Sequence, residues 1–172
     1  HLISFGLMDE PIDLSDIDDI ADEVKKAEIR RKQNYFSNAI SCYKEIVNKG
    51  VELSLETNIK GIFKLGAGLD LGEIEIKITG DKEHHMELDL FGESLIRAAR
   101  LQEYTKIIAD QFSQTTSLLV VSETAAQYNN NQEALITLKT TPHKVRNFSN
   151  LDQVFVKNID ILSQLELEKK AA

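Results

Sequence analysis

Tryptophan is absent from this 172-residue chain, and cysteine, proline and methionine are scarce, with one, two and two residues respectively. The single cysteine, Cys42, cannot form a disulfide within the chain, which favours a reducing compartment such as the cytoplasm. The longest apolar stretch, Leu118 to Val121, is far shorter than the roughly 20 residues that a membrane-spanning helix needs. We therefore predict a cytoplasmic domain without a membrane span, stabilised by its hydrophobic core.

Basic residues are also in deficit, because 20 lysines and arginines face 28 acids and give a net charge of −8. A nucleic-acid-binding domain usually carries a basic stripe, and none is evident, so nucleic acid is not an expected partner. Acids gather early in the chain, but without the glycine and the terminal glutamate of a calcium loop. They fit the first turn of a helix better, and no metal ligands are assigned to them. These acids are Asp13, Asp16, Asp18, Asp19 and Asp22.

Apolar residues at helical spacing predict several helices. The first starts at Ser15, with Asp18 completing a capping box. The second is expected to stop at Asn48-Lys49-Gly50, since glycine commonly follows a helix end. The predicted helices span about residues 15–31, 34–48, 93–112 and 159–167, with a short one beginning at 122–124.

Strict alternation of apolar and polar residues over 73–78 and 86–90 predicts a β-hairpin that turns at 79–82. A further strand over 59–69 is unusually rich in glycine, which marks a bulge or a close approach of another backbone. Additional strands are expected at residues 2–5, 118–121, 134–138 and 154–156. The order of elements predicts an α+β sandwich, with helices on one face of a mostly antiparallel sheet.

Three sequence blocks then resemble the second half of a class III adenylyl/guanylyl (nucleotidyl) cyclase domain. They are Gly68–Glu73 (GLDLGE), Leu88–Leu101 (LDLFGESLIRAARL) and Ser117–Glu123 (SLLVVSE), and the resemblance covers about residues 34–157. It implies a ferredoxin-like cyclase sandwich. On that basis we expect residues 1–157 to form a cyclase-homology domain, either whole or incomplete at its N-terminus, and residues 158–172 to form a C-terminal helix or tail.

The resemblance also implies a site between two domains that pair head to tail. Asp89 falls at the position of the purine-reading aspartate, and Arg100 at that of the arginine that stabilises the transition state. The place of the ribose-orienting asparagine holds Ile96, which cannot form that hydrogen bond. In the alternative interpretation neither residue binds a nucleotide: Asp89 is a solvated strand residue, and Arg100 forms a solvated basic helix face with Arg97.

The functional expectation is a degenerate cyclase-homology domain in cyclic-nucleotide signalling. It would form a homodimer, or a heterodimer with another cyclase domain, and bind ATP or GTP weakly. No cofactor is identifiable from the sequence, and Mg²⁺ or Mn²⁺ would be needed only by an active enzyme. Two alternatives stay open. The chain is part of an active adenylyl cyclase whose metal site comes from another segment or partner, or it is a pure dimerisation module.

Overall fold

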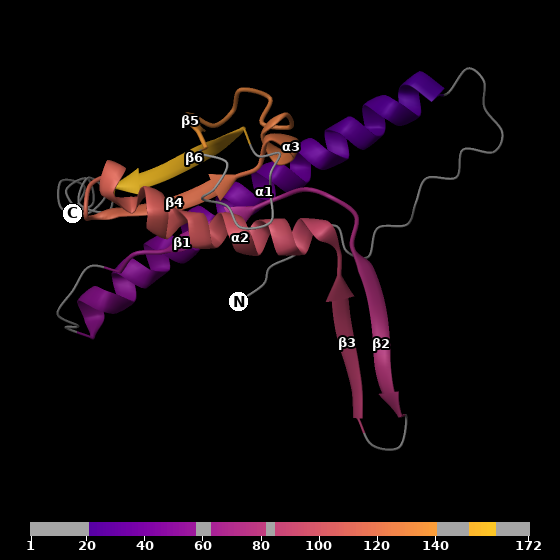
Figure 1. Ribbon diagram of the computed structural model, residues 1–172, viewed down its shortest axis with the longest axis horizontal. Helices are drawn as coiled ribbons and strands as arrows, with labels where there is room; N and C mark the ends of the chain where they lie inside the picture. Colours follow the sequence, from indigo (N-terminus) through magenta and orange to yellow (C-terminus); the bar gives the residue numbers. More distant parts are fainter. Residues whose placement is uncertain (1–20, 58–62, 82–84, 141–151, 161–172) are drawn as a thin grey trace.

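The chain folds into a body of helices and sheet from which a two-stranded hairpin projects (Figure 1). The structure, a computed structural model, describes residues 21–57, 63–81, 85–140 and 152–160. The body contains a long helix, α1 (Ala21–Glu56), and a shorter one, α2 (Glu93–Ile108). The prediction of a mixed α+β fold with a mostly antiparallel sheet is confirmed.

The sheet of the body has four strands in the order β1-β4-β6-β5. The first strand, β1, pairs in parallel with β4, whereas β4–β6 and β6–β5 are antiparallel pairs. A single 3₁₀ turn, η1, follows α2, and the short helix α3 follows β4. The bounds are β1 Gly66–Leu69, η1 Ala109–Gln111, β4 Thr116–Val121, α3 Glu123–Ala126, β5 Ile136–Lys139 and β6 Gln153–Asp160.

The two main helices cover opposite faces of this sheet. Successive residues of a strand point to opposite faces, and in β4 Leu119 and Val121 pack with α1 while Leu118 and Val120 pack with α2. The expectation that the helices share one face is therefore wrong. When helices cover both faces of a sheet, consecutive residues of a buried strand are all apolar. Strand β4 has this pattern from Leu118 to Val121.

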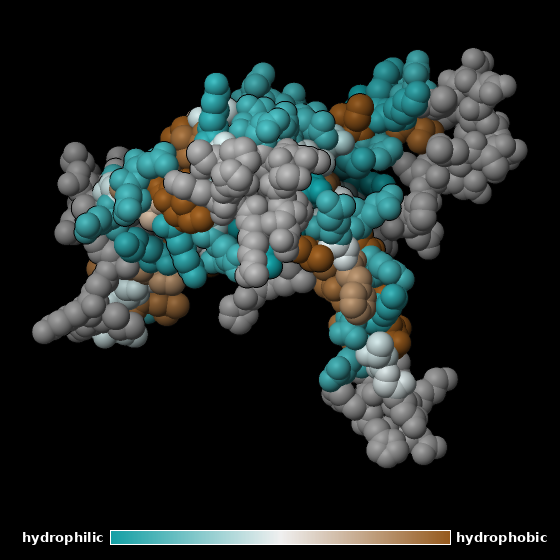
Figure 2. Space-filling view, viewed as in Figure 1, coloured by the Kyte–Doolittle hydropathy of each residue, from teal (hydrophilic) through white to brown (hydrophobic). Residues whose placement is uncertain are grey.

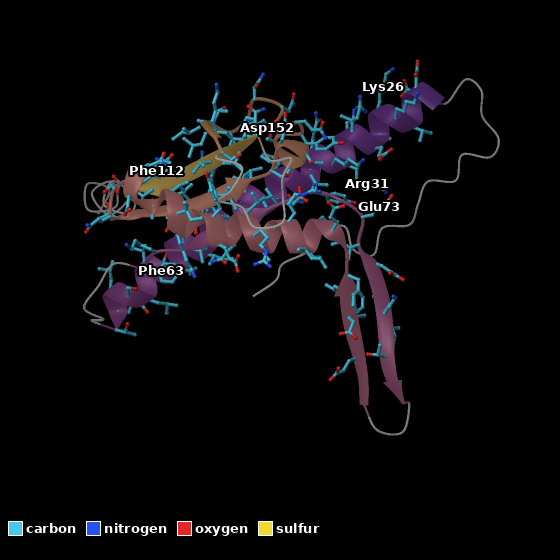
Figure 3. All side chains as sticks on the ribbon, viewed as in Figure 1. Lys26, Arg31, Phe63, Glu73, Phe112 and Asp152 are labelled. Atoms are coloured by element: carbon cyan, nitrogen blue, oxygen red, sulfur yellow. The ribbon has the colours of Figure 1, made fainter. Side chains whose placement is uncertain are left out.

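Helix α1 is continuous where the sequence predicted two helices and a stop at Gly50. Gly50 is buried inside α1, and a Cβ there would lie 2.3 Å from the ring of Phe63. Figure 3 shows Phe63 beside this end of α1. The glycine thus makes room for an aromatic ring, and the helix continues to Glu56 rather than giving way to a polar connection. Residues 15–20, at the predicted start, lie outside the described residues.

The glycines of β1 bring α2 unusually close to the sheet. A Cβ on Gly68 would lie 2.0 Å from the carbonyl oxygen of Ala98 and 2.6 Å from the backbone nitrogen of Gln102. A Cβ on Gly66 would lie 2.4 Å from the hydroxyl of Thr105. Close backbone approach, one of the two meanings predicted for these glycines, is confirmed.

The predicted hairpin is also confirmed, as β2 (Glu75–Asp81) paired in antiparallel fashion with β3 (His85–Phe91). The turn predicted at 79–82 is wrong at its first three residues, because pairing continues to Asp81 and His85. It is inserted between β1 and α2, and it leads away from the body (Figure 1). Glu73 lies at its root (Figure 3). Gly92 joins β3 to α2, where a Cβ would come within 2.7 Å of the carbonyl oxygen of Glu73.

The remaining helices and strands are of the predicted type, but their first and last residues differ from the prediction. The strand predicted at 154–156 is longer, since β6 continues to Asp160. The helix expected from residue 159 is therefore wrong at its first two residues, and the domain boundary expected between residues 157 and 158 falls inside this strand. The rest of that helix, and the strand expected at residues 2–5, lie outside the described residues. Within the described ranges, no helix combines the length and apolar character needed to cross a bilayer.

Candidate functional site

Asp89 lies in β3, on the polar face of the hairpin. Its register partner across the strands is Lys77, and the hydroxyl of Thr79 donates a 3.0 Å hydrogen bond to its Oδ2. The carboxylate is half-buried. Asp89 is thus held by its own hairpin, on a face that also carries the Lys77 amine.

Arg100 lies in α2, two turns after Gly92. Its guanidinium pairs with Glu103 one turn further on, at 2.7 Å. Ile96, one turn earlier, is 58% exposed, so the residue at the expected asparagine position faces outward. The structure thus places Asp89 and Arg100 in consecutive elements, with Asp89 bonded across the hairpin to Thr79 of β2 and Arg100 bonded within α2.

The opposite face of the hairpin is apolar. Residues directly across an antiparallel pair point to the same side, so Ile78 with Leu88, and Ile76 with Leu90, form one continuous face. We call these four residues the hairpin face. Ile78 is 64% exposed and Leu88 58% exposed. Figure 2 shows hydrophobic side chains along the upper part of the projecting hairpin.

A buried carboxylate that the sequence analysis missed lies where β1 ends. Asp70 has a fully buried side chain, accepts a hydrogen bond from the hydroxyl of Ser122 and lies 3.3 Å from the guanidinium of Arg97. Burial raises the pKa of Asp70, although Ser122 and Arg97 act in the opposite direction. Ser122 also caps α3, so this cluster ties the ends of β1 and β4 to two helices. An acid directly after a glycine-rich strand was the available signal.

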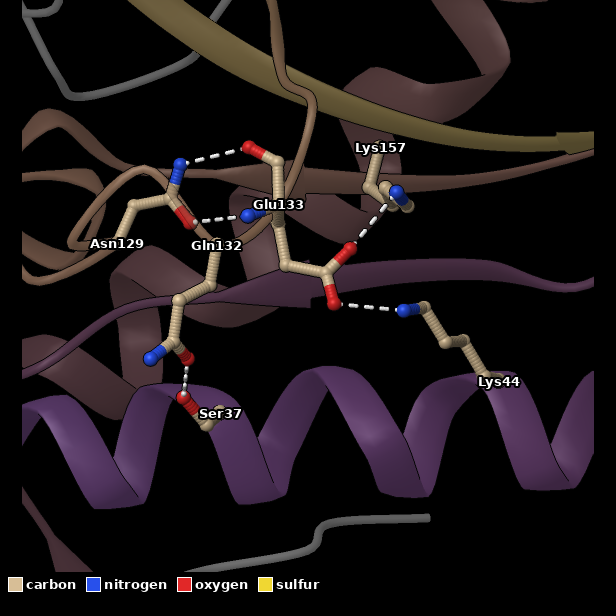
Figure 4. Close-up of polar contacts among 6 residues, drawn as sticks. All are labelled: Ser37, Lys44, Asn129, Gln132, Glu133 and Lys157. Atoms are coloured by element: carbon tan, nitrogen blue, oxygen red, sulfur yellow. Dashed lines mark hydrogen bonds and ion pairs between the residues drawn. The ribbon is translucent and has the colours of Figure 1, made fainter.

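A second polar cluster joins α1 to β6 and to the segment before β5, on the face of the sheet that α1 covers (Figure 4). Glu133 contacts Lys44 of α1 at 2.6 Å and Lys157 of β6 at 2.8 Å. Its backbone is held at both ends by the side chain of Asn129. Burial acts to raise the pKa of Glu133, but the two lysines outweigh it and hold the pKa below its usual range. The arrangement is that of a structural clamp.

One large cavity, of about 1060 Å³, lies between α1, β1 and α2. Its lining is mostly apolar, and it contains neither Asp89 nor Arg100. Asp70 lies at one end of it. Within the described residues, no group of three or more histidine, cysteine, aspartate or glutamate side chains is placed to hold a metal ion.

Comparison with known proteins identifies no relative, since no family model, no curated protein and no solved structure matches the chain.

Proposed function

We propose that this chain is a pairing domain of the nucleotidyl cyclase kind, which acts in cyclic-nucleotide signalling by associating with a second such domain and has little or no turnover alone. The observation that carries the proposal is the hairpin face. A two-stranded hairpin is at best marginally stable in water unless a further layer covers it. A second polypeptide chain on the hairpin face would supply that layer.

The hairpin has a polar side and an apolar side. Its polar side carries Lys77, Thr79, Glu87 and Asp89, with the Phe91 ring beside Lys77, whereas the hairpin face on the other side is exposed at Ile78 and Leu88 and half-buried at Ile76 and Leu90. Exposed apolar patches of this kind mark interaction surfaces more often than exposed single side chains do. Ile96, on α2 one turn after the hairpin ends, is a further exposed apolar residue.

The proposal that the chain has little or no cyclase turnover rests on the identity of individual residues, not on the shape of the fold. Ile96 offers no hydrogen bond at the position where the resemblance implies an asparagine, and Arg100 is engaged with Glu103. Asp89 and Arg100 nevertheless keep the charges that a purine base and a polyphosphate would meet. Weak binding of ATP or GTP by the paired domain is therefore part of the proposal.

The pairing is tested by sedimentation velocity on the wild-type chain and on Ile78→Lys. A lysine on the hairpin face would have to be desolvated in the contact, so Ile78→Lys should shift the chain from dimer to monomer, or raise Kd by about tenfold or more. Thr79→Lys is the matched control, since it places the same side chain one residue along, on the polar side of the hairpin. A wild-type chain that sediments as a monomer at all concentrations, alone and with a cyclase domain, would sink the proposal.

The catalytic part is tested by measuring cyclic AMP and cyclic GMP formed from ATP and GTP with Mn²⁺. The wild-type chain alone should give no more product than Arg100→Ala does, with Lys106→Ala as a control on the same helix. Turnover well above the Arg100→Ala level would instead favour the alternative of an active cyclase half.

A further inference from the structure

We propose that the free edge of β1 is a strand-addition site, and that the segment Leu2–Phe5 of the same chain occupies it. Strand β1 ends the order β1-β4-β6-β5, so within the described part of the chain only one of its two edges is paired. The inference concerns the cavity between α1 and α2, and it does not depend on the function of the hairpin.

The backbone groups at this edge belong to the two glycines of β1. The carbonyls of Leu65 and Leu69 accept hydrogen bonds from the β4 side, from the N–H groups of Leu118 and Ser122. In a parallel pair, alternate residues direct their N–H and C=O toward the partner strand. Gly66 and Gly68 therefore direct theirs to the other side, along the floor of the cavity, where an added strand would pair with them.

The sequence of β1 lacks the residues that usually prevent strand addition at an edge. Natural edge strands are protected by lysine, proline, bulges or a covering element. The sequence of β1 is Gly-Ala-Gly-Leu, which has no charge and no proline. The edge is instead recessed between two helices, which admits one strand but shields it from broad aggregation.

The walls of the cavity define the chemistry of the occupant. On the α1 side the lining includes Ala39, Cys42 and Ile46, and on the α2 side Leu95, Ala98 and Ala99. A strand places successive side chains against opposite walls. Because both walls are apolar, the occupant must be apolar on both of its faces, unlike the half-exposed strands of the hairpin.

In the segment Leu2-Ile3-Ser4-Phe5, each face carries at least one large apolar side chain, and the one polar residue, Ser4, is small and uncharged. The segment carries no charge, and its two faces present Leu2 with Ser4 and Ile3 with Phe5. Four residues in extended form span roughly 13 Å, the length of β1. By contrast, residues 161–172 contain two glutamates and two lysines and continue from β6, which β4 separates from β1.

The segment also has enough chain to reach the cavity. Residues 6–20 lie between it and α1, and 15 residues can span up to roughly 50 Å. The cavity begins at Tyr35, which is 14 residues along α1 from Ala21, or roughly 21 Å at the helical rise. The connection is therefore long enough to return along α1.

The test is amide hydrogen exchange on the 172-residue chain, read at Gly66 and Gly68 by NMR. In the wild-type chain both amides should exchange about a hundredfold more slowly than the amide of Gly80 at the exposed hairpin. The double variant Ile3→Glu with Phe5→Glu should lose that protection, because the cavity would have to bury two charges. The matched control, Ile12→Glu with Leu14→Glu, adds the same charges outside the segment and should keep it.

Two further measurements secure the result. Cys42 lines the cavity, so its alkylation by iodoacetamide should be about tenfold faster in the Ile3→Glu, Phe5→Glu variant than in the control. A synthetic peptide of residues 1–7, added to that variant, should restore slow exchange at both glycines. The amide of Val120 reports that the variant remains folded.

Three outcomes would overturn the proposal. They are fast exchange at Gly66 and Gly68 in the wild-type chain, protection that survives the double variant, and protection that rises with protein concentration. The last would assign the edge to a second copy of the chain.

Discussion

The body and the hairpin are built from similar strands but are stabilised in different ways. In the body, β4 lies between α1 and α2, and every residue from Thr116 to Val121 is buried. In the hairpin, paired residues such as Ile78 and Leu88 remain more than half exposed. The alternating pattern is therefore enough to form a strand pair, whereas burial depends on what the rest of the chain places against it. The following predictions separate the two regions by stability.

The largest effect is expected for Gly68→Ala in the body. The added Cβ would meet backbone atoms of α2, at 2.0 and 2.6 Å, which cannot rotate away as a side chain could. The free energy of unfolding should fall by more than about 3 kcal/mol, measured by urea denaturation followed by circular dichroism. Gly72→Ala, where the nearest atom is the Cβ of Ser94, is a milder control. Equal losses in the two variants would contradict the close approach of α2 to β1.

Truncation of a core residue should come next. Ile40 of α1 is fully buried in the cluster between α1 and the sheet. Ile40→Ala should lower the free energy of unfolding by about 2–5 kcal/mol, through lost burial and the cavity left behind. Thermal and urea unfolding would both register the change. Ile29→Ala, at a 48% exposed site of the same helix, is the control and should change stability little.

Two acids of the body, the half-buried Glu133 and the buried Asp70, should respond to pH in opposite directions. The folded-state pKa of Glu133 lies below its ordinary value of 4.5, so its contribution to stability is present above pH 4.5 and is lost as the pH falls through the folded-state pKa. Glu133→Gln should therefore be less stable than wild type near neutral pH, and the gap should narrow in acid. Urea unfolding between pH 3 and 7 measures both curves, and a gap independent of pH would exclude the lysine clamp as its cause.

For Asp70, the expected change of stability with pH has the opposite sign. Its folded-state pKa lies above the ordinary value of 3.8, so the folded chain holds the proton more tightly than the unfolded chain does. The favourable contribution of the protonated form is complete below pH 3.8 and is lost as the pH rises through the folded-state pKa. The stability of Asp70→Asn relative to wild type should thus improve with rising pH. A slope of the same sign as that for Glu133→Gln would show that Arg97 outweighs burial.

The smallest effect is expected in the hairpin. Ile78→Ala removes an exposed side chain, so the unfolding free energy of the monomer should change by less than about 0.5 kcal/mol. The measurement is urea unfolding at a protein concentration below that of dimer formation. A loss comparable to that of Ile40→Ala would mean that the hairpin face is covered within the monomer.

The contrast between regions also explains what the sequence could predict. The hairpin and the buried run Leu118–Val121 follow from local patterns, and both were located within a few residues. The continuity of α1 does not, because Gly50 reads as a helix end until Phe63, distant in the chain, is known to pack on it. Similarly, the apolar stripe of each helix predicts that one side of that helix is buried. It does not predict that the two helices pack on opposite faces of one sheet.

The buried site at Asp70 was beyond sequence reasoning for a related reason. Its partners, Arg97 and Ser122, belong to other elements, and Ser122 is 52 positions away in the chain. Asp89 and Arg100 were proposed from the resemblance rather than from their surroundings. Their partners in the structure, Thr79 and Glu103, give each a local structural role, so their assignment as nucleotide contacts stays a prediction.

The position of the hairpin within the chain gives it evolutionary freedom. It interrupts the connection between two parallel strands, and both of its ends are anchored at one place, near Glu73 and Gly92. Residues can thus be added or removed between the last paired residues, Asp81 and His85, while the ends stay where they are. The reach of this arm can change from one descendant of the gene to another without a compensating change in the core, and an affinity tag or fluorescent reporter could be inserted there.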